Sequence, residues 1–124
     1  MSDQIEKLQN KVFDLMESLA NANNELCEAG KDWAQAEHNY RQAKAVAYLG
    51  IVTDGEKRTV DHIKAMVDVK CDNQMLRARL AEARREAAFQ LVQSRRSELS
   101  AAQSLMRREI EEAAAVRYGQ TTGA

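Results

Sequence analysis

Apolar residues recur at alternating intervals of three and four through the first part of the chain. Counting in sevens from Ile5 gives a row of apolar or aromatic residues, and a second row starts at Leu8, while Asp, Glu, Lys, Asn and Gln fill most positions between. A 3.5-residue period held over about six heptads is typical of a long helix with one narrow stripe for packing on another helix. We call this stripe the seam. Its larger residues are Ile5, Leu8, Val12, Leu15, Leu19, Leu26, Trp33 and Tyr40, and its alanines are Ala22, Ala29, Ala36, Ala43 and Ala47.

The helix that carries the seam is predicted to run from about residue 3 to residue 49. Asp3 and Glu6 approximate a capping box at its start, because each side chain can satisfy a free backbone N–H of the first turn. Gly30 lowers the helix propensity, but the seam passes it in phase, so the sequence predicts a continuous helix. Gly50 is expected to end this helix in the left-handed conformation.

A second helix start follows after a few residues. Thr53 and Glu56 have the T-x-x-E spacing of a capping box, which predicts a second helix over about residues 54–116. A connection this short places two helices antiparallel. The predicted fold is therefore all-α: a long antiparallel helical hairpin with coiled-coil packing, forming one domain over residues 1–117. Residues 118–124, which include two glycines, are predicted to be a disordered tail.

The second helix carries more apolar surface than one partner helix needs, and this surface falls into two arcs. We expect one arc to pack on the first helix and the other on a neighbouring subunit, which predicts a homo-oligomer. One arc contains Val60, Ile63, Val67, Leu76, Leu80, Ala83 and Ala87, and the other contains Phe89, Val92, Leu99, Ala102, Leu105, Met106 and Ile110.

The composition agrees with long helices, since the 124 residues include no proline and five glycines, and 30% of them are charged. No apolar run could span a membrane, and the N-terminus has no basic region followed by an apolar one, so we expect a cytoplasmic protein. Cys27 and Cys71 stand alone and are expected to be reduced and partly buried. His38 and His62 lie outside metal-ligand and catalytic spacings, and we predict no metal, no cofactor and no enzymatic activity.

Arginine is concentrated in the second helix. Residues 77–108 include eight arginines against three glutamates, whereas residues 1–50 carry five Lys or Arg against eight Asp or Glu. Eleven residues complete three helical turns, so Arg85, Arg96 and Arg107 form a stripe with a step of about 16 Å. A planar guanidinium binds phosphate through two hydrogen bonds. The candidate nucleic-acid contacts are Arg77, Arg84, Arg85, Arg95, Arg96, Arg107 and Arg108.

Simpler interpretations of these side chains remain open. Spacings of three or four residues allow several arginines to pair with glutamates on one helix face and so to serve solvation alone. Trp33 and Tyr40 could stack on bases, but their place on the seam favours bulky packing residues opposed by alanine. The pairs allowed by spacing are Arg95 with Glu98, Arg107 with Glu111, and Arg108 with Glu112.

Between residues 30 and 112 the chain combines an aromatic and basic segment, a polar turn and a long helix rich in Ala, Leu and Arg. The residues of this order are Trp33, Glu37, Tyr40, Arg41, Lys44, Tyr48, Thr53, Ser97, Leu99, Ser104, Leu105, Arg107 and Arg108. In this order the chain resembles the small phage-encoded recombination mediators of the UvsY type. The resemblance implies a helical, ring-forming protein of the bacterial host cytoplasm. It also implies binding to single-stranded DNA and to a recombinase. In this family the mediator helps the recombinase to displace the single-strand-binding protein.

The sequence thus leads to two functional hypotheses. The first is an accessory protein of phage DNA recombination that binds single-stranded DNA as a helical homo-oligomer. The second is a structural or adaptor coiled coil, such as a phage assembly chaperone or inhibitor, that binds a protein partner without nucleic acid.

The substitution Leu15→Asp tests the seam. A carboxylate placed in the stripe cannot ionise there without disrupting the packing, so assembly should weaken. Sedimentation of the purified variant measures this change. A variant that sediments as the wild-type protein does would show that the seam is not buried.

Overall fold

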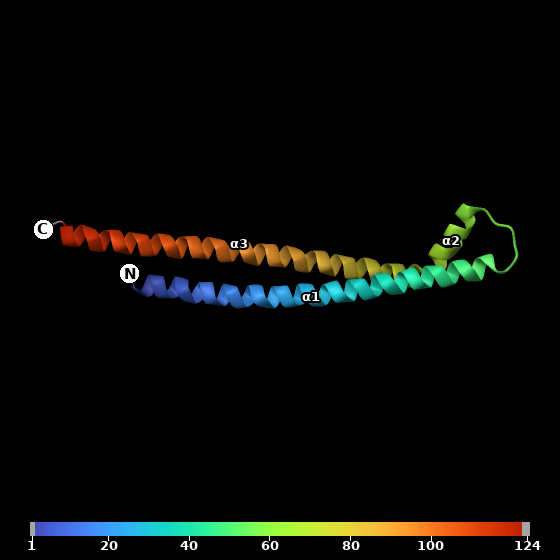
Figure 1. Ribbon diagram of the computed structural model, residues 1–124, viewed down its shortest axis with the longest axis horizontal. Helices are drawn as coiled ribbons and strands as arrows, with labels where there is room; N and C mark the ends of the chain where they lie inside the picture. Colours follow the sequence, from blue (N-terminus) through green and yellow to red (C-terminus); the bar gives the residue numbers. More distant parts are fainter. Residues whose placement is uncertain (1, 123–124) are drawn as a thin grey trace. The chain divides into compact units, whose positions relative to one another are not determined.

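The computed structural model describes residues 2–122, and the side chains of residues 3–119, and within this range the chain forms helices and no strand. The helices are α1 (Ser2–Val52), α2 (Val60–Lys70) and α3 (Asp72–Thr122), as Figure 1 shows. The all-α prediction is confirmed. The chain divides into two compact units, the first combining Met1–Glu25 with Phe89–Ala124 and the second formed by Leu26–Ala88.

The seam of α1 is its packed face. All thirteen seam residues are buried or half-buried, and Val12, Ala22 and Tyr40 are the most buried among them. The helix is continuous through Gly30, as predicted. A glycine inside a helix costs about 1 kcal/mol relative to alanine, and the packed seam residues on both sides of Gly30 offset this cost.

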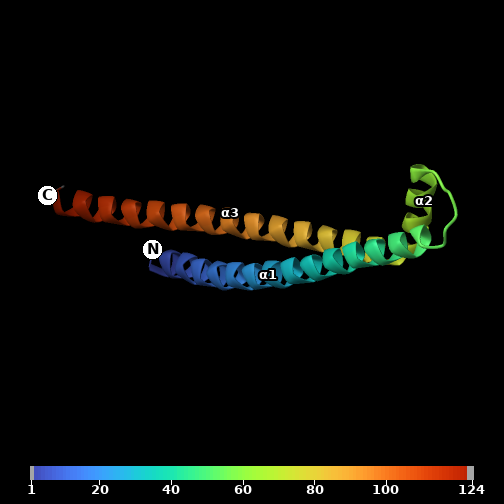
Figure 2. The ribbon, with the colours of Figure 1, turned by 45° about the vertical axis from the view of Figure 1, so that its right-hand side comes forward.

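In the first unit, the N-terminal part of α1 lies beside the C-terminal part of α3, with the opposite chain direction (Figures 1 and 2). The buried residues contributed by α3 are Val92 and Ala102, and Leu99 and Met106 are half-buried. Val92, Leu99 and Met106 lie seven residues apart. This part of α3 therefore packs with the same heptad period as the seam.

In the second unit, three helical segments share one small core. The core consists of Tyr40 and Ile51 from α1, Val67 from α2, and Cys71 and Ala78. Cys71 separates α2 from α3 with φ −105° and ψ 13°. The hydrogen bonds of the helix nevertheless continue across this break, because the Cys71 N–H donates to the Val67 carbonyl at 2.9 Å and the Cys71 carbonyl accepts from Met75 at 2.9 Å. Sequence reasoning did not predict this break.

The connection between α1 and α2 is longer than predicted, and the second helix begins at Val60 rather than near residue 54. The Thr53 hydroxyl donates to the carbonyls of Leu49, at 2.7 Å, and Gly50, at 3.4 Å. It therefore closes the last turn of α1 and does not cap a new helix. Thr59 is the actual N-cap of α2, where its hydroxyl accepts from the His62 N–H at 3.2 Å.

Two helix ends also differ from the predictions. Gly50 lies inside α1, and the glycine with a positive φ, of 79°, is Gly55 in the connection. α3 continues to Thr122, past the predicted end at residue 116, because a helix gains one hydrogen bond with each added residue and no proline interrupts it. The predicted disordered tail thus begins inside α3, and residues 123–124 lie outside the described part of the chain.

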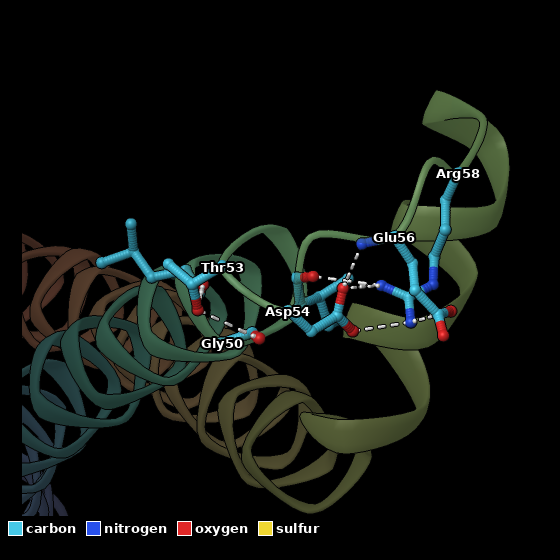
Figure 3. A network of polar contacts seen from close by, with 7 residues as sticks. Gly50, Thr53, Asp54, Glu56 and Arg58 are labelled. Atoms are coloured by element: carbon cyan, nitrogen blue, oxygen red, sulfur yellow. Dashed lines mark hydrogen bonds and ion pairs between the residues drawn. The ribbon is translucent and has the colours of Figure 1, made fainter.

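Arg58 organises the connection, as Figure 3 shows. Its guanidinium donates to the Ile51 carbonyl at 3.0 Å and contacts both carboxylate oxygens of Asp54, at 3.0 and 2.6 Å. It also pairs with Glu56 at 3.0 Å. The Glu56 N–H donates back to Asp54 at 3.0 Å, which closes a turn around Gly55. One side chain therefore ties the end of α1 to the segment that leads into α2.

The Asp54–Arg58 contact makes stability depend on pH. The hydrogen bond from Arg58, followed by the one from the Glu56 N–H, lowers the pKa of Asp54 below its ordinary value of 3.8. A carboxyl with a lowered pKa in the folded state stabilises the fold above its unfolded pKa, and this contribution disappears as the pH falls through the folded value. We expect Asp54→Asn to lower the melting temperature at pH 7, and the difference from wild type to shrink as the pH falls below about 3.8 and to vanish below the lowered pKa of the folded state.

Thermal melts recorded by circular dichroism across this pH range provide the measurement. Asp68→Asn is the matched control, because Asp68 is an exposed carboxylate of α2 and forms no ion pair with any described residue. If both variants melt alike at pH 7, the carboxylate of Asp54 does not stabilise the connection.

Candidate nucleic-acid interface

The predicted arginine contacts all lie on α3 and divide between the two units. Arg77, Arg84 and Arg85 belong to the second unit, and the others belong to the first. Six of the seven are exposed, whereas Arg95 is half-buried. α3 positions them because it is one regular helix from Asp72 onward, so sequence spacing fixes the direction of each side chain.

Arg85 covers the only tryptophan of the chain. Its guanidinium carbon lies 4.9 Å from the centre of the Trp33 ring, an arrangement that a cation–π interaction stabilises. Arg85 follows the buried Ala78 by seven residues, so both belong to the face of α3 that packs on α1 in this unit. The Trp33 indole N–H is buried and finds no acceptor among the described residues. Arg85 is therefore part of the packing around Trp33 and is not a freely solvated member of a stripe.

Trp33 and Tyr40 occupy seam positions, as the packing interpretation predicted. Tyr40 is only 8% exposed and belongs to the core of the second unit. The Lys44 ammonium lies 4.5 Å from the centre of the Tyr40 ring. A base could reach neither ring without displacing a packed or charged neighbour, so these aromatic residues do not form an open stacking platform.

Ion pairs occupy some arginines and leave others without a partner. Arg95 pairs with Glu98 at 3.2 Å, as its spacing predicted, and Arg79 pairs with Glu82 at 3.1 Å. The two other predicted pairs, Arg107 with Glu111 and Arg108 with Glu112, do not form. Within the described residues, no hydrogen bond or ion pair engages the side chains of Arg77, Arg84, Arg96, Arg107 or Arg108.

Arg77 also lines a groove of about 710 Å³ in the second unit, between α1 and the junction of α2 with α3. Sequence reasoning singled out Arg77 and missed the rest of this groove. The available signal was the seven-residue spacing of Lys70, Arg77 and Arg84, which places three basic residues in one row on a heptad helix. Of these three, Lys70 and Arg77 line the groove and Arg84 does not. The remaining lining residues are Asn39, Gln42, Ala43, Val46, Ala47, Gly50, Cys71 and Gln74.

Over residues 2–122, no group of three or more His, Cys, Asp or Glu side chains is placed to hold a metal ion. In the same range no helix is long and apolar enough to cross a membrane. Comparison with protein families, curated proteins and solved structures yields no match. A functional argument therefore depends on the side chains themselves.

Arg85→Ala tests the contact with Trp33. Removing the guanidinium uncovers the indole, so we expect a loss of about 0.5–1 kcal/mol in stability and a red shift of tryptophan emission. Arg84→Ala is the matched control, because it removes the same charge from the neighbouring exposed residue, which has no partner among the described side chains. Equal emission spectra and equal melting of the two variants would contradict the contact.

Proposed function

We propose that the protein binds single-stranded DNA as a helical homo-oligomer and assists a recombinase in phage DNA recombination. The observation that carries this proposal is the set of exposed arginines of α3 that have no carboxylate partner among the described residues. The resemblance to recombination mediators of the UvsY type adds the expectation that the recombinase and the single-strand-binding protein are its protein partners.

Unpaired arginines suit a phosphate backbone for a physical reason. A guanidinium already paired with a glutamate must lose that partner before it binds phosphate, whereas Arg96, Arg107 and Arg108 in the first unit have none to lose. Each can donate two parallel hydrogen bonds to one phosphate, and each contact releases condensed counterions. Such contacts hold any sequence of bases, as a recombination accessory requires.

Self-association is supported by surface area. The chain exposes 9452 Å², whereas a compact monomer of 13.9 kDa is expected to expose about 6,700 Å². In the second unit, Leu76 and Leu80 are 56% and 55% exposed, and Ala83 and Ala87 continue their row on the same helix face. These four residues are the second half of the first arc predicted from the sequence and are exposed, whereas Val67 of the same arc is buried in the core and Ile63 packs against it. We propose that coiled-coil packing against a neighbouring subunit covers the four exposed residues, which would also repeat the arginines around the assembly.

The same exposed row favours a second candidate function. An apolar row with heptad spacing is the surface that an amphipathic helix of another protein would cover. The protein would then act as a structural or adaptor coiled coil, and the arginines of α3 would keep the assembly soluble.

Replacing Arg96, Arg107 and Arg108 together by alanine separates the two functions. For a protein that binds single-stranded DNA, the slope of log affinity against log salt should flatten by about 0.7 for each phosphate that is no longer bound. Binding should weaken alike for all base sequences, because phosphate contacts carry no base information. Helix content should not change, since these side chains are exposed and have no partner among the described residues. Fluorescence anisotropy of a labelled oligonucleotide over a salt series measures the slope.

Arg95→Ala serves as the control in the same experiment. Arg95 adjoins Arg96 but is paired with Glu98, so its removal alone should change the salt slope less than Arg96→Ala does. Wild-type protein that assembles but does not bind an oligonucleotide would exclude the DNA-binding function and favour the adaptor.

A further inference from the structure

We propose that the groove at the α2–α3 junction holds one nucleotide of a bound single strand, with the phosphate on Lys70 and Arg77. This inference rests on the proposed function and deepens it, because it assigns a particular site in the second unit. The groove is open along one side and measures about 710 Å³. That volume lies in the range of small-molecule sites and suits a nucleotide better than a lone phosphate.

The two cations approach the groove from one side. Lys70 is the last residue of α2, and Arg77 follows it by seven residues, on α3. The break at Cys71 does not disturb this spacing, because the helical hydrogen bonds continue across it. Neither cation forms an ion pair with any described carboxylate. Arg77 is therefore free to bind an anion without first losing a partner, and Lys70 has only a longer-range attraction to Asp54, whose pKa its charge helps to lower.

The charge of the lining distinguishes this groove from its neighbours. No Asp or Glu is among the residues that line it. A second groove of the same unit sets Asp68 beside Lys44 and Lys64. In the first unit, one groove combines Lys11 with Glu98, and another combines Arg107 with Glu111. A carboxylate in the lining weakens the attraction for an anion, so among these four grooves the one at Lys70 and Arg77 has the most favourable lining for a phosphate.

Amide side chains make the groove suitable for a nucleobase as well. Gln42 and Asn39 lie on the α1 side of the groove. The side-chain oxygen of Asn39 already accepts a hydrogen bond from Gln35 at 2.9 Å, and the amide hydrogens of Asn39 remain as donors. On α3, the Gln74 side-chain oxygen is buried and has no donor among the described residues. A buried acceptor without a partner is unfavourable, and rotation of Gln74 toward a bound base would relieve it.

The α1 floor of the groove leaves the space for a ligand. Ala43, Ala47 and Gly50 contribute small side chains or none, and a Cβ added at Gly50 meets nothing within 4 Å. Ala43 and Ala47 belong to the seam, where small side chains allow α1 and α3 to pack closely. Gly50 lies outside the seam and is exposed, so packing does not require a glycine there. Its effect is to keep the groove open beside the two cations.

Arg77→Ala and Arg79→Ala form the first test. The two arginines lie two residues apart on α3, and both variants lose one positive charge, but only Arg77 lines the groove while Arg79 pairs with Glu82. We expect Arg77→Ala to weaken oligonucleotide binding about tenfold, the size of one charge-assisted hydrogen bond, and Arg79→Ala to have little effect.

Gly50→Glu and Gly30→Glu form the second test. Both replace a helical glycine of α1 in the same unit, both add one negative charge, and at both positions a Cβ meets nothing within 4 Å. Glutamate favours helix over glycine, so folding should be maintained or improved. Only Gly50→Glu places a carboxylate beside Lys70 and Arg77, and it should weaken binding about tenfold more than Gly30→Glu does.

The outcomes separate this inference from the proposed function. If wild-type protein binds the oligonucleotide, but the two variants within each pair weaken binding equally, the groove assignment is wrong and the proposed function stands. If wild-type protein binds no oligonucleotide, both are wrong. Competition with a mononucleotide and with inorganic phosphate completes the test. Stronger competition by the mononucleotide supports a nucleotide site, and equal competition would overturn that assignment.

Discussion

The packing of the seam against α3 is the interaction on which the rest of the structure depends. Helices of 51 residues expose most of their surface, and only nine hydrophobic residues of the described chain are buried. The free energy of folding must therefore come from many half-buried contacts repeated at heptad spacing. The same repetition holds the arginines of α3 in a fixed direction, because a helix that is packed along its length cannot rotate about its axis.

The sequence predicted α1 well and α3 less well, for a physical reason. In α1 the seam contains only apolar residues, so its phase is unambiguous. The packed face of α3 includes the half-buried Gln74 and Arg95, and the exposed Arg85 lies over Trp33. Polar residues at such positions hide the phase of the packed face. The spacing of eleven residues therefore grouped Arg85, which covers Trp33, with Arg96 and Arg107, which face solvent, in one predicted stripe. The groove was missed because its lining comes from α1, the end of α2 and the start of α3 together, and a pattern along the sequence does not show which segments lie side by side.

The connection shows how local signals compete. Thr53 and Glu56 matched a capping box, whereas Thr59 has no glutamate three residues later. Thr53 nevertheless closes α1, because the carbonyls of the helix that is already formed lie within reach of its hydroxyl. Arg58 then bridges seven residues back to Ile51. That contact depends on the position of the whole loop and has no signature in residue spacing.

The short length of α2 has a consequence for the groove. A helix of 11 residues is marginal in water by itself, so α2 remains helical through the burial of Val67 and the contacts around it. Lys70 is its last residue. Local opening of α2 would therefore remove one of the two cations from the groove. A ligand held by both cations would oppose that opening by mass action, so occupancy of the groove and slow amide hydrogen exchange in α2 are thermodynamically linked.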